Sequence, residues 1–272
     1  MGVTTKKIWQ LVDGFAPFAL AEEWDNSGLQ VGDMNWPVQR VLVALDVSLE
    51  VMAGAVQWGA DLVLTHHPLM MAPPKNVDFG RMPGRVLCAS ATEKISIISA
   101  HTNLDKAEKG LNDFFAGIIG LEGCTPFLPH WFPGETTETR AGLGRQGRFS
   151  SPLVLGDLAE FIKEKLSCTY LRITGDEEQI IRSAVVCTGS GASLTEKFLE
   201  SGQDLFITGD MKYHEAREIE QAGRALMDVG HFASEHIAVR LMVEQLKAAA
   251  EEAGILLEVK GFDKETDPFT TL

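Results

Sequence analysis

The sequence predicts an α/β fold with two domains whose sheets are largely parallel or mixed. Short apolar runs typical of buried strands alternate with segments of helical periodicity, and residues 41–65 run strand, helix, strand. This order implies a parallel strand pair joined by a right-handed crossover. A stretch rich in proline and glycine, about residues 122–150, then interrupts the pattern before it starts again, which indicates a crossing between domains.

The first series of elements is defined by its periodicity. Residues 4–21 have apolar positions at helical spacing, and Pro17 lies near the end of that helix. The segment 22–32 is rich in Asp, Asn, Ser and Gly and is predicted as a loop. After it we expect strands at 41–46, 61–65 and 95–100 and helices at 48–59, 81–93 and 110–120.

The second series follows the interruption. We expect a helix at 155–166, strands at 169–173 and 183–187, a helix that ends near Gly202, a strand at 204–207, a helix from about 213, a strand at 225–229, a helix from 231 to about 253 and a last strand at 255–259. The runs of Val, Ile and Leu suit sheets that are buried on both faces.

Composition limits the classes of function. The chain has 24 Lys and Arg against 38 Asp and Glu, a formal charge of −14, which disfavours nucleic-acid binding because that needs cations facing phosphates. The four cysteines are widely spaced without a CxxC pair, which indicates a reducing compartment. We find no signal peptide and no apolar run of about 20 residues, so we expect a cytoplasmic protein without a membrane segment.

Two adjacent histidines follow the apolar strand at 61–65. His66 and His67 come where the strand ends, and Pro68 favours an extended backbone at His67. Ligands bind at the carboxyl ends of strands in open α/β sheets, and neutral imidazole is the commonest metal ligand. The pair is therefore a candidate metal site. The alternative is one histidine in the core and one on the surface.

Two further strand ends carry the same chemistry. His101 and Asp105 follow one predicted strand, and His231 and Glu235 follow another. The second pair is spaced four residues apart, so a helix would place both side chains on one face. Nitrogen and carboxylate donors without thiolate suit Zn, Mn, Fe, Co or Ni better than Ca or Mg.

The number of donors favours two metal ions. A mononuclear catalytic zinc site usually takes three protein ligands, and at least five candidates are present here. Neighbouring side chains on an extended backbone diverge, so we expect His66 and His67 to hold one ion each. Two ions about 3.5–4 Å apart can share a water or hydroxide that attacks a substrate. These residues indicate a two-metal hydrolase, while two separate sites or a non-catalytic site stay open.

Six short motifs occur in an order that resembles one known family. They are Trp24–Leu29 (WDNSGL), Thr65–Pro68 (THHP), His101–Asp105 (HTNLD), Gly142–Arg145 (GLGR), Thr208–Asp210 (TGD) and Gly230–Glu235 (GHFASE). Together they resemble the Nif-three-like dinuclear metal-centre family, catalogued as GTP cyclohydrolase 1 type 2 homologs, over about residues 8–260. Each motif is weak alone, and the ordered set is specific.

The resemblance implies a ligand set and an assembly. The metal ligands that it implies are His66, His67, Asp105, His231 and Glu235. Glu235 would bridge two divalent ions in a cleft at the strand carboxyl ends. The resemblance also implies two interlinked α/β domains and a toroidal homohexamer with the sites facing its interior. Longer relatives carry an inserted middle domain, for which this chain is too short.

Combining the element series with the resemblance, we assign residues 1–125 and 226–272 to a discontinuous metal-binding domain. Residues 126–225 then form the second α/β domain.

Several other polar residues have competing interpretations. We expect His101 to orient Asp105 or a ligand histidine rather than bind metal. Family members often carry two histidines after the Thr-Gly motif, where this chain has Tyr213 and His214. His214 is either a general acid or base or a surface residue, and we take it as the catalytic candidate. Lys212 is more simply explained as a solvated side chain than as a phosphate ligand. Candidates for orienting ligands are Asp25, Asn26 and Asp46.

Two glycine-rich segments are candidates for phosphate-binding loops. Gly189–Gly191 lies between a strand and a helix, but it matches neither GxGxxG nor the P-loop. We therefore predict a tight turn there. The segment Gly142–Gly147, with Arg145, carries a similarly weak phosphate signal.

These observations lead to a hydrolase hypothesis. We expect a cytoplasmic enzyme that uses two divalent ions on a small, phosphorylated or nucleotide-like substrate, similar to GTP cyclohydrolase 1 type 2 by resemblance. The alternative is a non-catalytic metal-binding or scaffold hexamer.

Overall fold

The computed structural model describes residues 2–131 and 140–270, and their contacts divide the chain into two compact units. Unit 1 comprises Met1–Ala107 and Ala238–Glu265, and unit 2 comprises Glu108–Ile237 and Thr266–Leu272. The chain thus builds unit 1 in two passes, before and after unit 2. Each unit has an α/β architecture, which confirms the predicted fold class.

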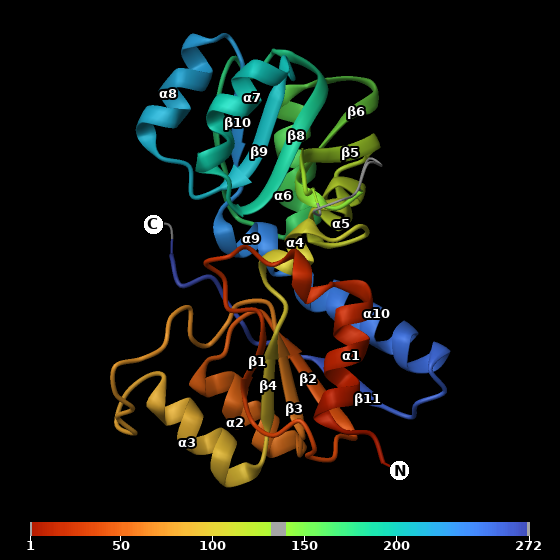
Figure 1. The fold of residues 1–272 in the computed structure, drawn as a ribbon. Coiled ribbons are helices and arrows are strands. Elements are labelled where there is room, and N and C mark those ends of the chain that lie inside the picture. The colour runs from red at the N-terminus through yellow and green to blue at the C-terminus, as the bar shows by residue number, and fades with distance from the viewer. Residues whose placement is uncertain (1, 132–139, 271–272) are drawn as a thin grey trace. The chain divides into compact units, whose positions relative to one another are not determined.

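Unit 1 is built on a five-stranded sheet (Figure 1). Its strands lie in the order β1 (Gly28–Val31), β4 (Ser96–Ser99), β3 (Leu62–Thr65), β2 (Arg40–Ala44) and β11 (Glu258–Gly261). Only β1 and β4 pair in antiparallel fashion among these neighbours, and the predicted parallel pairing of β2 with β3 is confirmed. The helices of unit 1 are α1 (Thr5–Phe15), η1 (Phe18–Leu20), α2 (Leu49–Trp58), α3 (Gly84–Glu93), α4 (Thr102–Lys106) and α10 (Ile237–Glu252).

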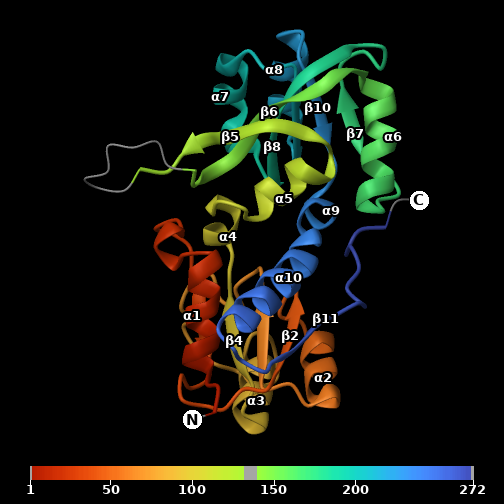
Figure 2. The ribbon, with the colours of Figure 1, turned by 90° about the vertical axis from the view of Figure 1, so that its right-hand side faces the viewer.

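Helices cover both faces of this sheet. Figures 1 and 2 show α2 and α3 on one face and α1 and α10 on the other. Leu42, Val63 and Ile97 of neighbouring strands pack with Val51 of α2 and Val86 of α3. Because β3 and β4 are buried along their whole length, neither shows the apolar–polar alternation of a half-exposed strand, and the buried serines of β4 stand only at its two ends.

Unit 2 contains a six-stranded mixed sheet. Its strands lie in the order β5 (Leu121–Pro129), β6 (Gly142–Val154), β8 (Ile180–Ser190), β9 (Leu205–Gly209), β10 (Ala225–Asp228) and β7 (Arg172–Thr174). The β8, β9 and β10 strands are parallel, and the other pairings are antiparallel. The helices of unit 2 are α5 (Leu111–Ile118), α6 (Leu155–Leu166), η2 (Ala192–Leu194), α7 (Thr195–Ser201), α8 (Tyr213–Gln221) and α9 (His231–Glu235).

Side chains of β8 and β9 alternate between two hydrophobic clusters, one on each face of the sheet of unit 2. Val186 of β8 and Ile207 of β9 pack in the cluster that contains α5 and α6. Val185 and Phe206, one residue away, pack with Phe198 of α7 on the opposite face. This alternation follows from the two-residue repeat of a strand and holds β8 and β9 in register.

The unit boundaries differ from the expected ones at both crossings. We assigned residues up to 125 and from 226 onward to one domain. In the structure, α5 and β5 belong to unit 2, and so do β10 and α9, because β10 pairs in parallel with β9. This correction moves His231 and Glu235 out of the unit that contains the adjacent histidines.

Strands β1, β5 and β6 were not predicted. β5 is an edge strand, where Pro126 is tolerated because one side of the strand needs no ladder bond. A Cβ added to Gly142 would lie 2.3 Å from the Leu128 carbonyl oxygen, and one added to Gly147 would lie 2.7 Å from that of Glu122. Glycine in this hairpin therefore reflects close strand approach, whereas the sequence suggested a linker.

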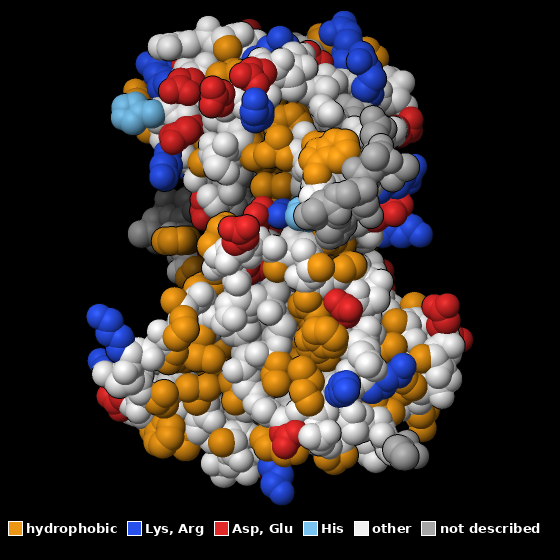
Figure 3. Space-filling view, in the orientation of Figure 1, with side chains coloured by type: hydrophobic (Ala, Val, Ile, Leu, Met, Phe, Trp, Pro, Cys, Tyr) orange, Lys and Arg blue, Asp and Glu red, His pale blue; other side chains and the backbone are white. Residues whose placement is uncertain are grey.

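The connection between β3 and α3 exposes apolar side chains. Met71, Val77, Phe79 and Met82 are 45%, 50%, 64% and 46% exposed. Figure 3 shows hydrophobic side chains gathered on the surface near the place where Figure 1 draws α2 and α3. Gathered apolar surface of this kind indicates an interaction site.

Candidate functional site

The adjacent histidines lie on a bend directly after β3. The Thr65 hydroxyl donates to the His67 carbonyl oxygen at 2.8 Å, and the His67 amide donates to the Leu45 carbonyl oxygen at 2.9 Å. The ring centroids of His66 and His67 are 5.1 Å apart. Our expectation that these side chains diverge is therefore wrong: the bend brings one nitrogen of each ring within 4.8 Å of the other.

Both rings are oriented through Nδ1. His66 is fully buried, and its Nδ1 lies 2.8 Å from the Ala100 carbonyl oxygen. Because a carbonyl only accepts, Nδ1 carries the proton and Nε2 keeps its lone pair. His67 places Nδ1 2.9 Å from Oδ1 of Asp46, just after β2, so Asp46 has the orienting position that we expected. Metal-binding histidines are held in this way.

Asp105 adds an oxygen to this cluster. It lies on α4, a short helix after β4, and is 7% exposed. Its Oδ1 is 3.7 Å from Nε2 of His66, which is longer than a hydrogen bond. If each of these two atoms bound the same metal ion at about 2.1 Å, they could lie this far from one another. The geometry therefore suits the ligand role predicted for Asp105.

His101 is oriented by Asp25, not by Asp105 or a ligand histidine as we expected. Its Nδ1 lies 2.8 Å from Oδ1 of Asp25, whose carboxylate also accepts hydrogen bonds from Ser27 and Thr102. Burial alone would raise the pKa of Asp25, but the hydrogen bonds from His101, Thr102 and Ser27 outweigh it and hold the pKa well below its usual range. Asp25 is therefore an ionised acceptor that fixes the His101 ring.

Unit 2 carries the second predicted set. His231 Nε2 lies 2.8 Å from Oε2 of Glu235, which confirms that both residues share one helix face. His231 Nδ1 lies 2.8 Å from Oδ2 of Asp210, a residue with φ of +53° directly after β9. The hydrogen bond to Glu235 raises the pKa of His231 to about 9; burial opposes this shift, and the charges of Glu235 and Asp210 support it. The expected long helix is in fact two, because α9 ends at Glu235 and α10 begins at Ile237.

Glycines allow the segments around α9 to approach closely. A Cβ on Gly189 would lie 2.1 Å from Oε1 of Glu235, and a Cβ on Gly209 would lie 2.8 Å from the His231 amide nitrogen. The Gly189 amide donates to the Ser234 hydroxyl at 3.0 Å. This amide is already engaged, so it does not form an anion cradle. The predicted tight turn is displaced, because β8 continues to Ser190 and Gly189 lies within the strand.

The five predicted ligands are therefore divided between the units. His66, His67 and Asp105 lie together in unit 1, and His231 and Glu235 lie together in unit 2. The sequence did not lead us to predict that Asp210 orients His231, nor that Asp25 orients His101. Strand-end position marks both Asp46 and Asp210, and that signal could have identified Asp210 as well.

His214 and Lys212 lie at the start of α8. Both side chains are exposed, and the His214 ring has an edge contact with Tyr213 at a centroid distance of 5.4 Å. Lys212 has the solvated position that we favoured for it.

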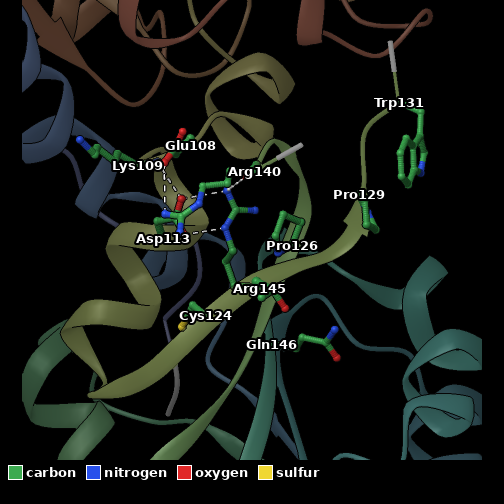
Figure 4. A pocket seen from close by; sticks show the side chains of 11 residues that line it. Glu108, Lys109, Asp113, Cys124, Pro126, Pro129, Trp131, Arg140, Arg145 and Gln146 are labelled. Carbon is green, nitrogen blue, oxygen red and sulfur yellow. Dashed lines mark hydrogen bonds and ion pairs between the residues drawn. The ribbon is translucent and has the colours of Figure 1, made fainter. Parts of the chain in front are cut away.

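A pocket of about 620 Å³ in unit 2 contains the other phosphate candidate (Figure 4). Arg145 is 1% exposed, and its guanidinium forms a bidentate ion pair with Asp113 at 2.6 and 2.9 Å. The same group donates to the carbonyl oxygens of Gly142 and Gly144. Arg145 is thus occupied in holding the start of β6 against α5, so the weak phosphate signal has a structural explanation.

Both ligand sets fit a divalent transition metal. Their donors are imidazole nitrogens and carboxylate oxygens, which suit Zn, Mn, Fe, Co and Ni. His66 and His67 each have Nδ1 fixed by an acceptor, so that Nε2 is the atom that can bind a metal ion. Both ring nitrogens of His231 face carboxylates, so an ion at its Nε2 would take the place of a proton. None of the helices in residues 2–131 and 140–270 has the length and apolar character needed to cross a bilayer.

Comparisons with known proteins place this geometry in context. A family model described as Duf34/NIF3 (NGG1p interacting factor 3) matches residues 3–268. Two similar proteins are each named GTP cyclohydrolase 1 type 2 homolog. The one from Clostridium acetobutylicum is 30% identical over 269 residues and 99% of each chain. The one from Streptomyces coelicolor is 36% identical over 262 residues, 95% of this chain and 91% of its own. A crystal structure of a Staphylococcus aureus protein aligns with a TM-score of 0.93 over 100% of each chain at 26% identity.

Proposed function

The chain belongs to the Duf34/NIF3 family, and from that premise we propose that it is a divalent-metal-dependent hydrolase of a small, phosphorylated or nucleotide-like substrate. The name GTP cyclohydrolase 1 type 2 homolog, carried by its relatives, makes GTP the first compound to test. The proposed cofactors are two divalent ions per chain, held by the five predicted ligands His66, His67, Asp105, His231 and Glu235, with Glu235 as the predicted bridge. The proposed compartment is the cytoplasm, as the spaced cysteines suggest.

One observation carries the proposal. The Nδ1 atoms of His66, His67 and His231 are each held by a carbonyl or carboxylate oxygen 2.8–2.9 Å away. This orients all three rings. For His66 and His67 it also fixes the tautomer, raises the basicity of Nε2 and presents it as a donor before any ion binds, whereas an ion at Nε2 of His231 would displace the proton that faces Glu235. A histidine that only fills the core has no need for such orientation next to other donors.

Different residues of the chain have different roles in such a reaction. A divalent cation at these sets would supply Lewis acidity and make water a nucleophile near neutral pH. Asp46 and Asp210 hold His67 and His231 in place, and the low exposure of Asp105 and Glu235 limits the access of bulk water to these two carboxylates. A dry site strengthens each electrostatic contact with a substrate.

We assign proton transfer to His214. It is exposed at the start of α8, where an imidazole can exchange protons with solvent. Its ring has an edge contact with that of its neighbour Tyr213.

A substrate screen tests the proposal. Protein purified without chelator should contain close to two divalent ions per chain, and GTP, other nucleotides, phosphoesters and cyclic amides should be assayed for hydrolysis. His66→Ala and Glu235→Ala should abolish turnover while circular dichroism shows a folded chain. Turnover that survives both substitutions would place the chemistry elsewhere.

The alternative is a non-catalytic metal-binding hexamer, and the exposed apolar connection of unit 1 favours assembly in either case. Phe79 and Met82 are 64% and 46% exposed, which suggests a surface that another copy covers. Light scattering should then give about six times the 29.7 kDa of one chain. Full metal loading without turnover across the whole screen would select the non-catalytic alternative.

A further inference from the structure

Trp24 is an exposed aromatic residue beside the histidines of unit 1. It is 62% exposed, and its indole meets the His101 ring edge-on, with an angle of 78° between the ring planes. Centroid distances of 6.2 Å from Trp24 to His101 and 5.6 Å from His101 to His67 leave at most about 12 Å between Trp24 and His67. A large flat side chain thus lies open to solvent next to the predicted donors.

The backbone around Trp24 forms a closed turn that is fixed at both ends. The Asp25 amide donates to the Glu22 carbonyl oxygen at 2.9 Å and closes the turn around Trp24. On one side the Glu22 amide donates to the Thr102 hydroxyl at 3.0 Å, and the Glu22 carboxylate pairs with the buried Lys106 at 2.6 Å. On the other side the Asp25 carboxylate accepts from the Thr102 amide at 3.1 Å. Both ends are attached to α4, so the fold itself sets where the indole stands.

The exposure of this indole is therefore built into the fold. Elsewhere in unit 1, Trp9 stacks on Phe18 with centroids 4.8 Å apart, and Trp58 packs against the Arg40 guanidinium. A tryptophan can bury 150–250 Å² of surface, and a turn this well fixed leaves most of that area of Trp24 in water. An aromatic ring that is already positioned can cover a flat ligand without a large ordering cost, because little of the protein has to be immobilised on binding.

We propose that Trp24 is a specificity residue of the hydrolase, whose indole stacks on the planar ring of a purine-type substrate beside the donors of unit 1. The inference rests on the proposed function and adds to it the class of substrate, a heteroaromatic ring compound. Stacking of a base on an aromatic side chain is worth about 1–3 kcal/mol by alanine substitution, which corresponds to about 5–100-fold in affinity.

Two probes that differ only in the base test this contact. GMP carries a purine, a ribose and one phosphate, and ribose 5-phosphate is the same compound without the purine. Equilibrium dialysis against the metal-loaded protein should show tighter binding of GMP. Trp24→Ala should weaken GMP binding by about 5–100-fold and leave the binding of ribose 5-phosphate and the metal content unchanged.

Two further variants separate stacking from a structural effect. Trp24→Phe keeps an aromatic face and should retain most of the affinity for GMP. Trp131→Ala is the matched control, because Trp131 is 58% exposed but belongs to unit 2, and it should change the binding of neither probe. A purine stacked on an indole quenches its fluorescence, so GMP should quench the native protein and Trp131→Ala, but not Trp24→Phe.

The outcomes distinguish this inference from the proposed function. GMP binding that is absent from the native protein, or unchanged in Trp24→Ala, would overturn the stacking role, while hydrolysis of phosphoesters without a base would still support the hydrolase. An equal loss of both probes in Trp24→Ala would make Trp24 a support for the His101 ring and refute its contact with substrate. Selective loss of GMP binding would support the stacking role even if no compound in the screen is hydrolysed.

Discussion

Replacing Gly189 by alanine should break the metal-binding set of unit 2 without changing a ligand. Gly189 lies near the end of β8 with φ of +65°, and an added Cβ would be 2.1 Å from Oε1 and 3.0 Å from Cδ of Glu235. The Glu235 side chain is only 5% exposed, so it has little room to move away.

The size of the effect follows from these distances. Ordinary contact begins at 3.4 Å, so the Glu235 oxygen must move by about 1.3 Å. Metal–ligand distances tolerate deviations of only about 0.2 Å, so the carboxylate is lost as a donor. We expect metal affinity at this set to fall by about 100-fold or more, equivalent to about 2.7 kcal/mol. The backbone strain of a non-glycine residue at this φ costs about 1–2 kcal/mol of folding stability.

Gly202→Ala is the matched control for this experiment. Gly202 ends α7 in the same unit with φ of +73°, and an added Cβ would meet no atom within 4 Å. Urea unfolding should show similar destabilisation of both variants, while competition of Zn²⁺ binding against a chelator should show weakened affinity only for Gly189→Ala. Equal affinity of the two variants would refute the assignment of Glu235 as a ligand in this geometry.

Three further predictions concern unit 2. His214→Ala should lower turnover of the identified substrate by about 10²–10⁴-fold with metal content unchanged; unaltered turnover would make His214 a surface residue. Asp113→Ala should cost about 3–5 kcal/mol in urea unfolding, because it strands the buried guanidinium of Arg145. Glu108→Ala, which removes an exposed ion pair, should cost less than about 1 kcal/mol, and equal losses would contradict this account. Burial and the nearby Asp113 raise the pKa of the Cys124 thiol, so iodoacetamide should modify it more slowly than a free cysteine near pH 8, with the rate still rising above pH 9; fast labelling at pH 7 would be inconsistent with that pKa.

Periodicity located most helices and central strands of this chain. The helix predicted at 155–166 has the bounds of α6, because its apolar residues repeat every three to four positions on a polar background. β5 and β6 were missed because Pro126 and Gly142 usually mark loops, and only pairing at a sheet edge makes them compatible with strands. The domain boundary failed for a related reason: β10 is assigned to unit 2 by its pairing with β9, a contact that local sequence does not encode.

The sequence by itself determined the donor types and the His231–Glu235 pair, because four-residue spacing on a helix fixes which side chains share a face. Only the tertiary structure decided how the donors are held. His101 meets Asp25 across 76 positions of chain, and His66 meets the Ala100 carbonyl across 34. The relation between His66 and His67 was also settled in three dimensions, since a bend after β3 replaced the expected extended backbone. Such partners depend on strand register and loop packing, which bring distant segments together by contacts that no local spacing specifies.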